Sequence, residues 1–314
     1  MWQDDPNWQM TGLFLLALAV MGFTMKLIAL LLPATIEPDR PQVFWLLPSP
    51  ASHRRLRPIV NVRAVLVRTS LLCGGLVLSY WIYGQLVEAV GIGSVLRSYC
   101  AAPALLLMSE TLVALVTLLW LPSGQVLPSI HNRPWLARSI ADFWGQRWNL
   151  WFSDWTRYAI FQRLRRRPVF ALVLAFAVSG ILHEWVVNVP LYFVTGRAPF
   201  GTMMLYFLVQ AVGVLVERRF KGRPILLASF AWLVIFAPAP LVLNEGLLRT
   251  LHLWPEPAHH FGSQQPDKSA ARERFVCTTG PIGHHWRGAA EPYCRITNVY
   301  DSKSVCAAGE AGSA

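Results

Sequence analysis

A histidine and a glutamate stand side by side within a strongly apolar stretch of the chain. They are His183 and Glu184 in the run SGILHEW at residues 179–185, inside the apolar segment Val169–Pro190. Ionisable groups are costly in a lipid bilayer, and those that occur there commonly serve a function. Because imidazole titrates near neutral pH, His183 is a candidate general base. The alternative for the pair is a helix–helix hydrogen bond that only fixes packing.

Metal-dependent and serine-protease chemistry fit the same run poorly. The zinc motif H-E-x-x-H requires a second histidine where the chain has Val187. Di-iron sites need several histidines, and the apolar runs of this chain contain one. A Gly-x-Ser-Gly frame around Ser179 is absent because position 177 is an alanine. The histidines and cysteines after residue 255 match no common ligand spacing, so no metal site is predicted.

A second group of residues, DFWGQRWN at 142–149, lies upstream and is followed by Trp151 and Trp155. Tryptophan faces stack on purines and arginine side chains bind phosphates, so this pattern predicts a surface that takes an adenine-and-phosphate cofactor from the cytoplasm. The amide of Asn149 can polarise a carbonyl oxygen. An aromatic anchor in the membrane interface is the alternative.

The elements that carry these residues are predicted to be membrane helices. The 314 residues are 54% apolar and only 14% charged, with a mean hydropathy of +0.40, which argues against a soluble enzyme. The predicted class is an all-α polytopic membrane protein with about six or more transmembrane helices. Six apolar runs are long enough to span a bilayer: Thr11–Leu32, Thr69–Val90, Ala102–Leu121, Val169–Pro190, Phe200–Val216 and Pro224–Leu243.

The basic residues predict the orientation of these helices. They crowd the loops before the second, fourth and sixth runs, whereas the opposite loops hold only Arg97 and Arg197. The positive-inside rule therefore predicts cytoplasmic basic loops and both termini on the outer or lumenal side. Since this topology accounts for the net charge of +11, no nucleic-acid partner is predicted.

Two further segments complete the predicted organisation. Residues 136–161 are amphipathic and rich in tryptophan, which predicts a helix lying in the cytoplasmic interface. Residues 43–47 are apolar but short, so they are expected to be interfacial or re-entrant. The chain is expected to divide into a membrane domain at 1–254, with its motifs in 125–250, and a poorly ordered polar tail at 255–314.

These motifs resemble those of the membrane-bound O-acyltransferases, and among them the wax-synthase-like branch. The resemblance rests on FW at 143–144, RWN at 147–149, SG at 179–180, HE at 183–184 and Gln210 in the next apolar run. It covers residues 125–250 best, while the first third of the chain matches only as hydrophobic helices. About six helices is fewer than the family usually shows, so short or broken helices near residues 43–47 and 136–161 are expected to supply the rest.

The resemblance implies a multi-helix fold, with interfacial helices, that encloses a tunnel through the bilayer. Acyl-CoA would enter from the cytoplasm as a co-substrate, with no permanently bound cofactor, and a lipophilic alcohol would enter from the membrane lipid or the far side. In this scheme His183 takes the hydroxyl proton, Asn149 holds the acyl donor or stabilises the oxyanion, and Glu184 orients His183 or shares its charge.

The resemblance also implies substrate-binding residues. Trp144, Arg147 and Trp148 would line the CoA entrance, and Ser179 and Gln210 would face the substrates. Among known reactions, wax-ester formation is the leading expectation.

A transporter or channel is the rival interpretation. In it, His183, Glu184 and Glu110 of the third apolar run would relay protons. That interpretation also predicts matching broken helices in two halves of the chain, which the sequence lacks.

Overall fold

The chain divides into two compact units, Met1–Pro255 and Glu256–Ala314. Helices make up almost all of the first unit's described elements, which confirms the predicted all-α class. In the second unit a short antiparallel pair is described, β3 (Cys294–Ile296) with β4 (Ser304–Cys306). The computed structural model describes residues 5–32, 47, 49, 52, 55–59, 61–90, 94–220, 222–254, 294–296 and 304–306. The predictions for residues 43–47 and 255–314 fall largely outside these ranges.

Five helical segments of the described residues are long and apolar enough to cross a membrane, which identifies an integral membrane protein. The fourth of them does not end at His183, because a π-turn, η5, continues it into α9. The segments are α1 (Pro6–Leu31), α4 (Val62–Val90), α5 (Ser94–Leu119), the continuous run of α8 (Pro168–His183), η5 (Glu184–Asn188) and α9 (Val189–Thr195), and α11 (Pro224–Phe236) with its extension to Leu241.

The structure corrects the predicted spans in two respects. Run 200–216 forms α10 (Thr202–Glu217), whose 16 residues are about 24 Å long and which is thus shorter than the five segments above, although it returns the chain to the end where α8 begins. Helix α4 begins at Val62 rather than at the predicted Thr69. Arg63 and Arg68 lower the hydropathy of that first part, but Arg68 forms an ion pair with Glu110 of α5, which attaches this turn to its neighbour.

The segment 136–161 does not form one continuous interfacial helix, but the short and broken helices that were also expected there. The segment consists of short pieces that break at Trp148 and Asn149, where Asn149 takes the left-handed conformation with φ of 41°. Asparagine tolerates this conformation better than most residues. The pieces are the 3-10 turn η2 (Pro134–Leu136), α6 (Ile140–Asp142), the π-turn η3 (Phe143–Arg147), α7 (Leu150–Thr156) and the π-turn η4 (Arg157–Phe161).

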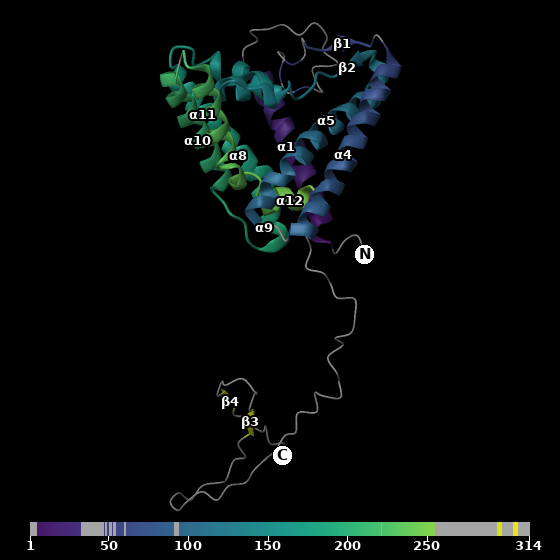
Figure 1. The fold of residues 1–314 in the computed structure, drawn as a ribbon, viewed down its shortest axis with the longest axis vertical. Coiled ribbons are helices and arrows are strands. Elements are labelled where there is room, and N and C mark those ends of the chain that lie inside the picture. Colours follow the sequence, from purple (N-terminus) through teal and green to yellow (C-terminus); the bar gives the residue numbers. More distant parts are fainter. Residues whose placement is uncertain are drawn as a thin grey trace, which may run out of the picture. The chain divides into compact units, whose positions relative to one another are not determined.

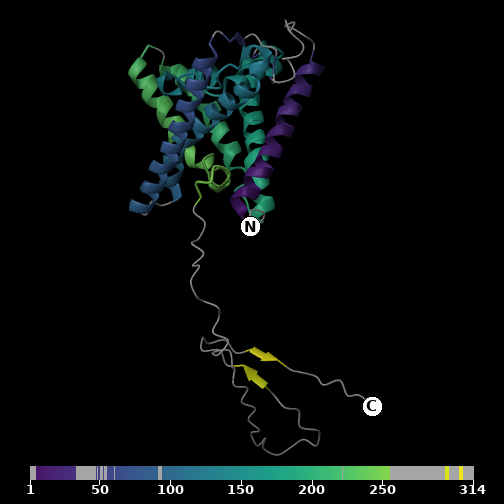
Figure 2. The same ribbon diagram turned by 90° about the vertical axis from the view of Figure 1, so that its right-hand side faces the viewer.

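The long helices of the first unit stand in two groups. Helix α4 lies against α5, while α8 lies against α10, which in turn contacts α11 (Figures 1 and 2). Helix α1 contacts α9 and the short helix α12 (Glu245–Thr250). The remaining described elements are short: η1 (Leu121–Ser123), η6 (Arg218–Phe220), η7 (Ala239–Leu241) and the antiparallel pair of β1 (Arg57–Pro58) with β2 (Gln125–Val126).

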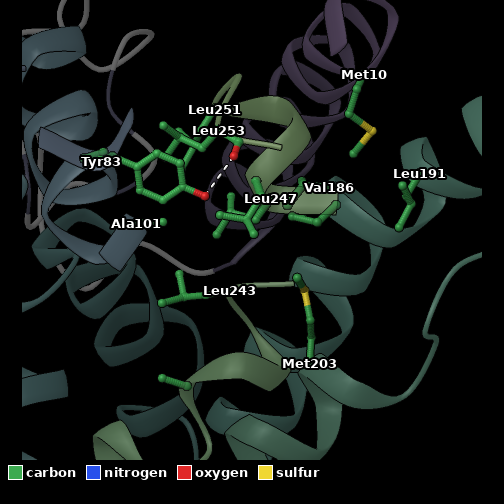
Figure 3. Packing of buried hydrophobic residues seen from close by; sticks show 14 of the residues in the cluster. Met10, Tyr83, Ala101, Val186, Leu191, Met203, Leu243, Leu247, Leu251 and Leu253 are labelled. Atoms are coloured by element: carbon green, nitrogen blue, oxygen red, sulfur yellow. Dashed lines mark hydrogen bonds between the residues drawn. The ribbon is translucent and has the colours of Figure 1, made fainter. Parts of the chain in front are cut away.

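The largest apolar cluster joins both groups at the end where α9 and α12 lie. Figure 3 shows its side chains converging from several helices, with the Tyr83 hydroxyl donating to the Leu253 carbonyl at 2.8 Å. Between membrane helices, such side chains stabilise the fold through close van der Waals packing rather than through removal from water. The cluster therefore holds the two helix groups together at one end, and the short helices of residues 134–161 lie at the other end. Its members include Met10 of α1, Tyr83 of α4, Ala101 of α5, Leu191 of α9, Met203 of α10 and Leu247 of α12.

Candidate active site

His183 is the last residue of α8, and its ring is held from within the same helix. The imidazole Nδ1 lies 2.7 Å from the backbone carbonyl oxygen of Ser179, one turn earlier. A carbonyl oxygen only accepts hydrogen bonds, so Nδ1 carries the proton and the neutral ring keeps its lone pair on Nε2. The ring also packs on Phe207 of α10, with centroids 4.5 Å apart. His183 is therefore arranged as a base through Nε2.

Glu184, the next residue, forms hydrogen bonds at the start of α10. Its Oε1 accepts from the backbone N–H groups of Met203 and Met204, at 3.0 and 3.2 Å, and its Oε2 accepts from the Asn188 amide at 2.6 Å. A carboxylate at a helix N-terminus satisfies free N–H groups and complements the helix dipole. In the structure Glu184 thus caps α10, and the expectation that it orients His183 stays a prediction.

A glycine sets the distance between the two helices beside His183. A Cβ atom added at Gly180 would lie 2.9 Å from the Cα atom of Met204, which is closer than side chains approach a backbone. Only glycine fits there without moving α10. The close approach brings Phe207 of α10 against His183.

Trp144 and Gln210 are bonded to each other beside Phe207. The Trp144 indole N–H donates to Gln210 Oε1 at 3.2 Å, and the Gln210 amide donates to the Val234 carbonyl at 2.8 Å. Gln210 is completely buried, and the Trp144 ring lies 5.4 Å from that of Phe207. The structure therefore brings Trp144, Gln210 and His183 together around one phenyl ring.

Arg147 and Trp148 are engaged by neighbouring side chains. The Arg147 guanidinium pairs with Asp142 at 2.7 Å. The Trp148 ring stacks on Phe143 at 5.6 Å and packs against His131 at 4.3 Å. Their predicted contact with CoA stays a prediction.

Asn149 lies between Trp148 and α7 and caps that helix. Its Oδ1 accepts from the N–H of Phe152 at 3.2 Å, so the cap uses the oxygen of the amide and not its nitrogen, Nδ2. Among the described residues no acceptor for Asn149 Nδ2 is found in hydrogen-bond range. The group is a donor that can serve a carbonyl oxygen.

His131 is a residue that the sequence reasoning missed. It is 8% exposed, its Nδ1 accepts from the Asn149 N–H at 3.2 Å, and its Nε2 bonds the Ser109 hydroxyl at 2.8 Å. Burial lowers the pKa of His131 to about 4, so the ring is neutral at physiological pH. Its position just ahead of the aromatic motif was the only signal in the sequence.

A cavity of about 440 Å³ lies between α8 and residues 140–161, the stretch from α6 to η4 that is called the motif segment below. Leu172, Ala175, Phe176 and Ser179 of α8 line one side, and Trp144 lines the other. The wall is mostly apolar and extends along α8 to within one turn of His183. His183 and Asn149 are not among the residues that line this cavity, so they are not shown to converge in it.

The guanidinium of Arg157 also lines this cavity. Arg157 donates to the Gly145 carbonyl and lies 3.6 Å from the carboxylate of Asp154. Asp154 is 2% exposed and also accepts from Arg55 at 3.0 Å. Burial raises the pKa of the Asp154 carboxyl, while Arg55 and Arg157 lower it. The cavity thus combines an apolar wall with one positive charge.

The part of the chain that the structure describes holds no group of three or more His, Cys, Asp and Glu side chains suited to a metal ion. Glu110, the third residue of the predicted relay, accepts from Arg68 and from the backbone N–H of His131. It therefore supports the site from α5 rather than continuing a chain from His183.

Residues 127–209 match the model of the membrane bound O-acyl transferase family. This match confirms, for this region of the chain, the resemblance to that family deduced from the sequence. The matched region contains the motif segment, α8 and His183, so the family signal coincides with the site.

Several curated proteins are similar to part of the chain. A probable long-chain-alcohol O-fatty-acyltransferase of Arabidopsis thaliana is 32% identical over 129 residues, which are 38% of this chain and 37% of that protein. The long-chain-alcohol O-fatty-acyltransferase of Simmondsia chinensis is 34% identical over 106 residues, 29% of each chain. An acyl-CoA–sterol O-acyltransferase of Arabidopsis thaliana is 35% identical over 106 residues, again 29% of each.

The chain spans between 29% and 47% of the length of the first curated relatives it matches. No solved structure matches the chain.

Proposed function

We propose that this protein is a membrane O-acyltransferase that moves an acyl group from acyl-CoA to the hydroxyl of a lipophilic alcohol. The observation that carries the proposal is the bond between His183 Nδ1 and the Ser179 carbonyl, at 2.7 Å. It leaves Nε2 unprotonated in a neutral ring, which is the state that a general base requires.

In the proposed reaction, His183 Nε2 takes the proton of the alcohol hydroxyl while the oxygen attacks the thioester carbonyl carbon. A tetrahedral oxyanion forms, and the Asn149 amide donates to it. When the carbon–sulfur bond breaks, the proton passes from His183 to the departing CoA sulfur. The products are an ester and free CoA. A thioester is already activated, so one base and one donor suffice.

The cavity beside α8 fits an acyl thioester donor. Its apolar side, from Leu172 to Ser179, suits an acyl chain, and the charge of Arg157 suits a phosphate of CoA. Because apolar walls exclude water, the donor would be protected from hydrolysis.

We further propose that acyl-CoA enters this cavity from the cytoplasm. The motif segment lies at the end where α8 begins and α10 ends, since Glu217, the last residue of α10, accepts from the Ile140 N–H at 2.6 Å. Arg165, Arg166, Arg167 and Arg218 lie at this end. By the positive-inside rule this end is cytoplasmic, and the termini face the outer or lumenal side.

The proposal is tested by transfer from labelled acetyl-CoA and palmitoyl-CoA to long-chain alcohols and sterols in membranes that contain the chain. The decisive variant is His183→Asn, because an asparagine amide can still donate to the Ser179 carbonyl but supplies no base. We expect ester formation by the wild type and a loss of at least 100-fold in the variant.

The matched control is Trp185→Phe, two residues further along and 43% exposed. It should retain wild-type transfer at equal expression. Wild-type rates in His183→Asn would remove the proposed base. Wild-type membranes that transfer neither acyl group to any acceptor class would contradict the proposed reaction.

A further inference from the structure

The segment that contains His131 is bonded to the aromatic motif on both sides of this residue. The Leu150 N–H donates to the Ile130 carbonyl at 2.8 Å, and the Asn132 N–H donates to the Arg147 carbonyl at 2.8 Å. Between these two backbone bonds, the Asn149 N–H points to a side chain instead, His131 Nδ1 at 3.2 Å. The imidazole therefore takes the place of a backbone acceptor.

The conformation of Asn149 explains why such an acceptor is needed. Its φ of 41° is in the left-handed region, where a non-glycine residue is strained. The backbone turns sharply there before α7 begins. A fixed acceptor for the N–H at this turn holds the residue, and with it the direction of its side-chain amide.

The His131 ring is itself fixed from the α4–α5 pair. Its Nε2 donates to the Ser109 hydroxyl at 2.8 Å, since Nδ1 is the acceptor. Its backbone N–H donates to Glu110 at 2.8 Å, and Glu110 is paired with Arg68 of α4 at 2.8 Å. Helices α4 and α5, which supply none of the proposed catalytic groups, are thereby connected to Asn149.

We propose that His131 is a positioning residue that holds the backbone of Asn149, so that the Asn149 amide is aimed at the reacting thioester carbonyl. This inference rests on the proposed function of Asn149 in acyl transfer. In this proposal the buried His131 neither takes a proton nor touches the substrate, and it acts only through Asn149. Misplacement of a catalytic group by about 1 Å can cost about 100-fold in rate.

Two conservative variants separate the two bonds of the ring. The amide of asparagine ends at about the position of imidazole Nδ1, so His131→Asn retains an acceptor for the Asn149 N–H. The longer glutamine amide reaches the position of Nε2, so His131→Gln retains the bond to Ser109 and loses the one to Asn149. The two variants otherwise remove the same ring and its contact with Trp148.

The first measurement is amide hydrogen exchange of the peptide 147–152 in the purified full chain, which needs no substrate. We expect exchange at least tenfold faster in His131→Gln and close to wild type in His131→Asn. Equal exchange in the two variants would overturn the proposal, whatever reaction the protein catalyses.

The second measurement is the turnover rate for acyl transfer at saturating acyl-CoA. We expect His131→Asn within threefold of wild type and His131→Gln at least tenfold lower, at matched thermal stability. Equal losses in both, or a loss that follows thermal stability alone, would show a merely structural role.

A double-mutant cycle with Asn149→Ala completes the test. If His131 acts through Asn149, adding His131→Gln to Asn149→Ala lowers turnover no further. An additional tenfold loss would contradict positioning. Wild-type transfer by Asn149→Ala itself would remove the proposed role of Asn149. A wild type without transfer would overturn the proposed function. Because hydrogen exchange needs no substrate, it still shows in either case whether His131 holds the backbone of Asn149.

Discussion

The imidazole of His183 and the carbonyl of Ser179 lie one helical turn apart and 2.7 Å from each other. The bond uses a backbone group, so it does not depend on the side chain at position 179. The base is thus oriented by the helix that carries it, while the Ser179 side chain is left to line the cavity.

Ser179→Ala should therefore separate binding from chemistry. The carbonyl remains, so His183 keeps its tautomer and we expect turnover within about threefold of wild type. The loss of the hydroxyl from the cavity wall is expected to appear in KM for acyl-CoA. Steady-state kinetics with palmitoyl-CoA measure both. A hundredfold loss of turnover at unchanged KM would assign the Ser179 hydroxyl to the transition state instead.

Glu184→Gln should lower stability more than it lowers turnover. Glu184 accepts from the N–H groups of Met203 and Met204 at the start of α10. Loss of such a charged cap costs about 1 kcal/mol. We expect turnover per folded enzyme within threefold of wild type and a lower melting temperature in detergent. The opposite result, lost turnover at unchanged stability, would favour the role beside His183 that the family resemblance implies.

The class of fold was predictable from the sequence, and Trp144, His183 and Gln210 were named there as candidate site residues. Apolar runs locate membrane helices because each bilayer crossing requires about 20 such residues. The bond between Trp144 and Gln210 was not predicted, because the order of motifs does not show which side chains touch. The order of the motifs pointed to candidate site residues, which hydropathy alone does not distinguish from other residues.

The roles of Glu184 and His131 were not predictable in the same way. Successive side chains on a helix point about 100° apart, so adjacency with His183 does not predict that the Glu184 carboxylate bonds the start of α10. The bond from Asn149 to His131 joins residues 18 positions apart through a left-handed turn. Neither hydrophobic periodicity nor composition predicts the dihedral angle of a single residue. The same left-handed turn at Asn149 interrupts the interfacial helix that was predicted over 136–161.

Gly180→Ala should force α8 and α10 apart. The new Cβ would lie 2.9 Å from the Cα atom of Met204, a backbone atom that cannot rotate away. Overpacking of this kind costs about 1–3 kcal/mol. We expect a lower melting temperature together with reduced turnover, because the contact between His183 and Phe207 depends on this approach.

The control for Gly180 is Gly74→Ala in α4, where an added Cβ meets nothing within 4 Å. Alanine is the better helix former, so this variant should be neutral or slightly more stable. Equal effects at the two glycines would mean that helix propensity, rather than the α8–α10 contact, governs the result.

Ala175→Phe should shorten the acyl chains that the enzyme accepts. Ala175 lines the cavity of about 440 Å³, and a phenyl group there fills part of the space proposed for the chain. Transfer from palmitoyl-CoA is expected to fall at least tenfold relative to transfer from acetyl-CoA. Val173→Phe, on the same helix but 37% exposed and outside the cavity wall, is the control. Equal losses with both donors would place the chain elsewhere.

The pH dependence of stability should report on His131. Burial lowers its pKa to about 4 in the folded chain, from about 6.5 when unfolded. Below pH 6.5 the unfolded chain binds a proton that the folded chain does not, so stability falls as the pH falls toward 4. The full destabilisation, reached below pH 4, is about 3 kcal/mol, and it is absent above pH 6.5.

His131→Asn removes this titrating group and retains the acceptor for Asn149, so wild type and variant should differ in their pH slopes. Melting temperatures in detergent at pH 7.5, 5.5 and 4.5 measure the difference, and the contributions of all other groups, Glu110 beside His131 included, cancel between the two proteins to first order. Wild type should lose stability relative to the variant from pH 6.5 downward. Parallel curves would mean that the ring takes up a proton in the folded state, which is incompatible with Nδ1 as the acceptor for the Asn149 N–H.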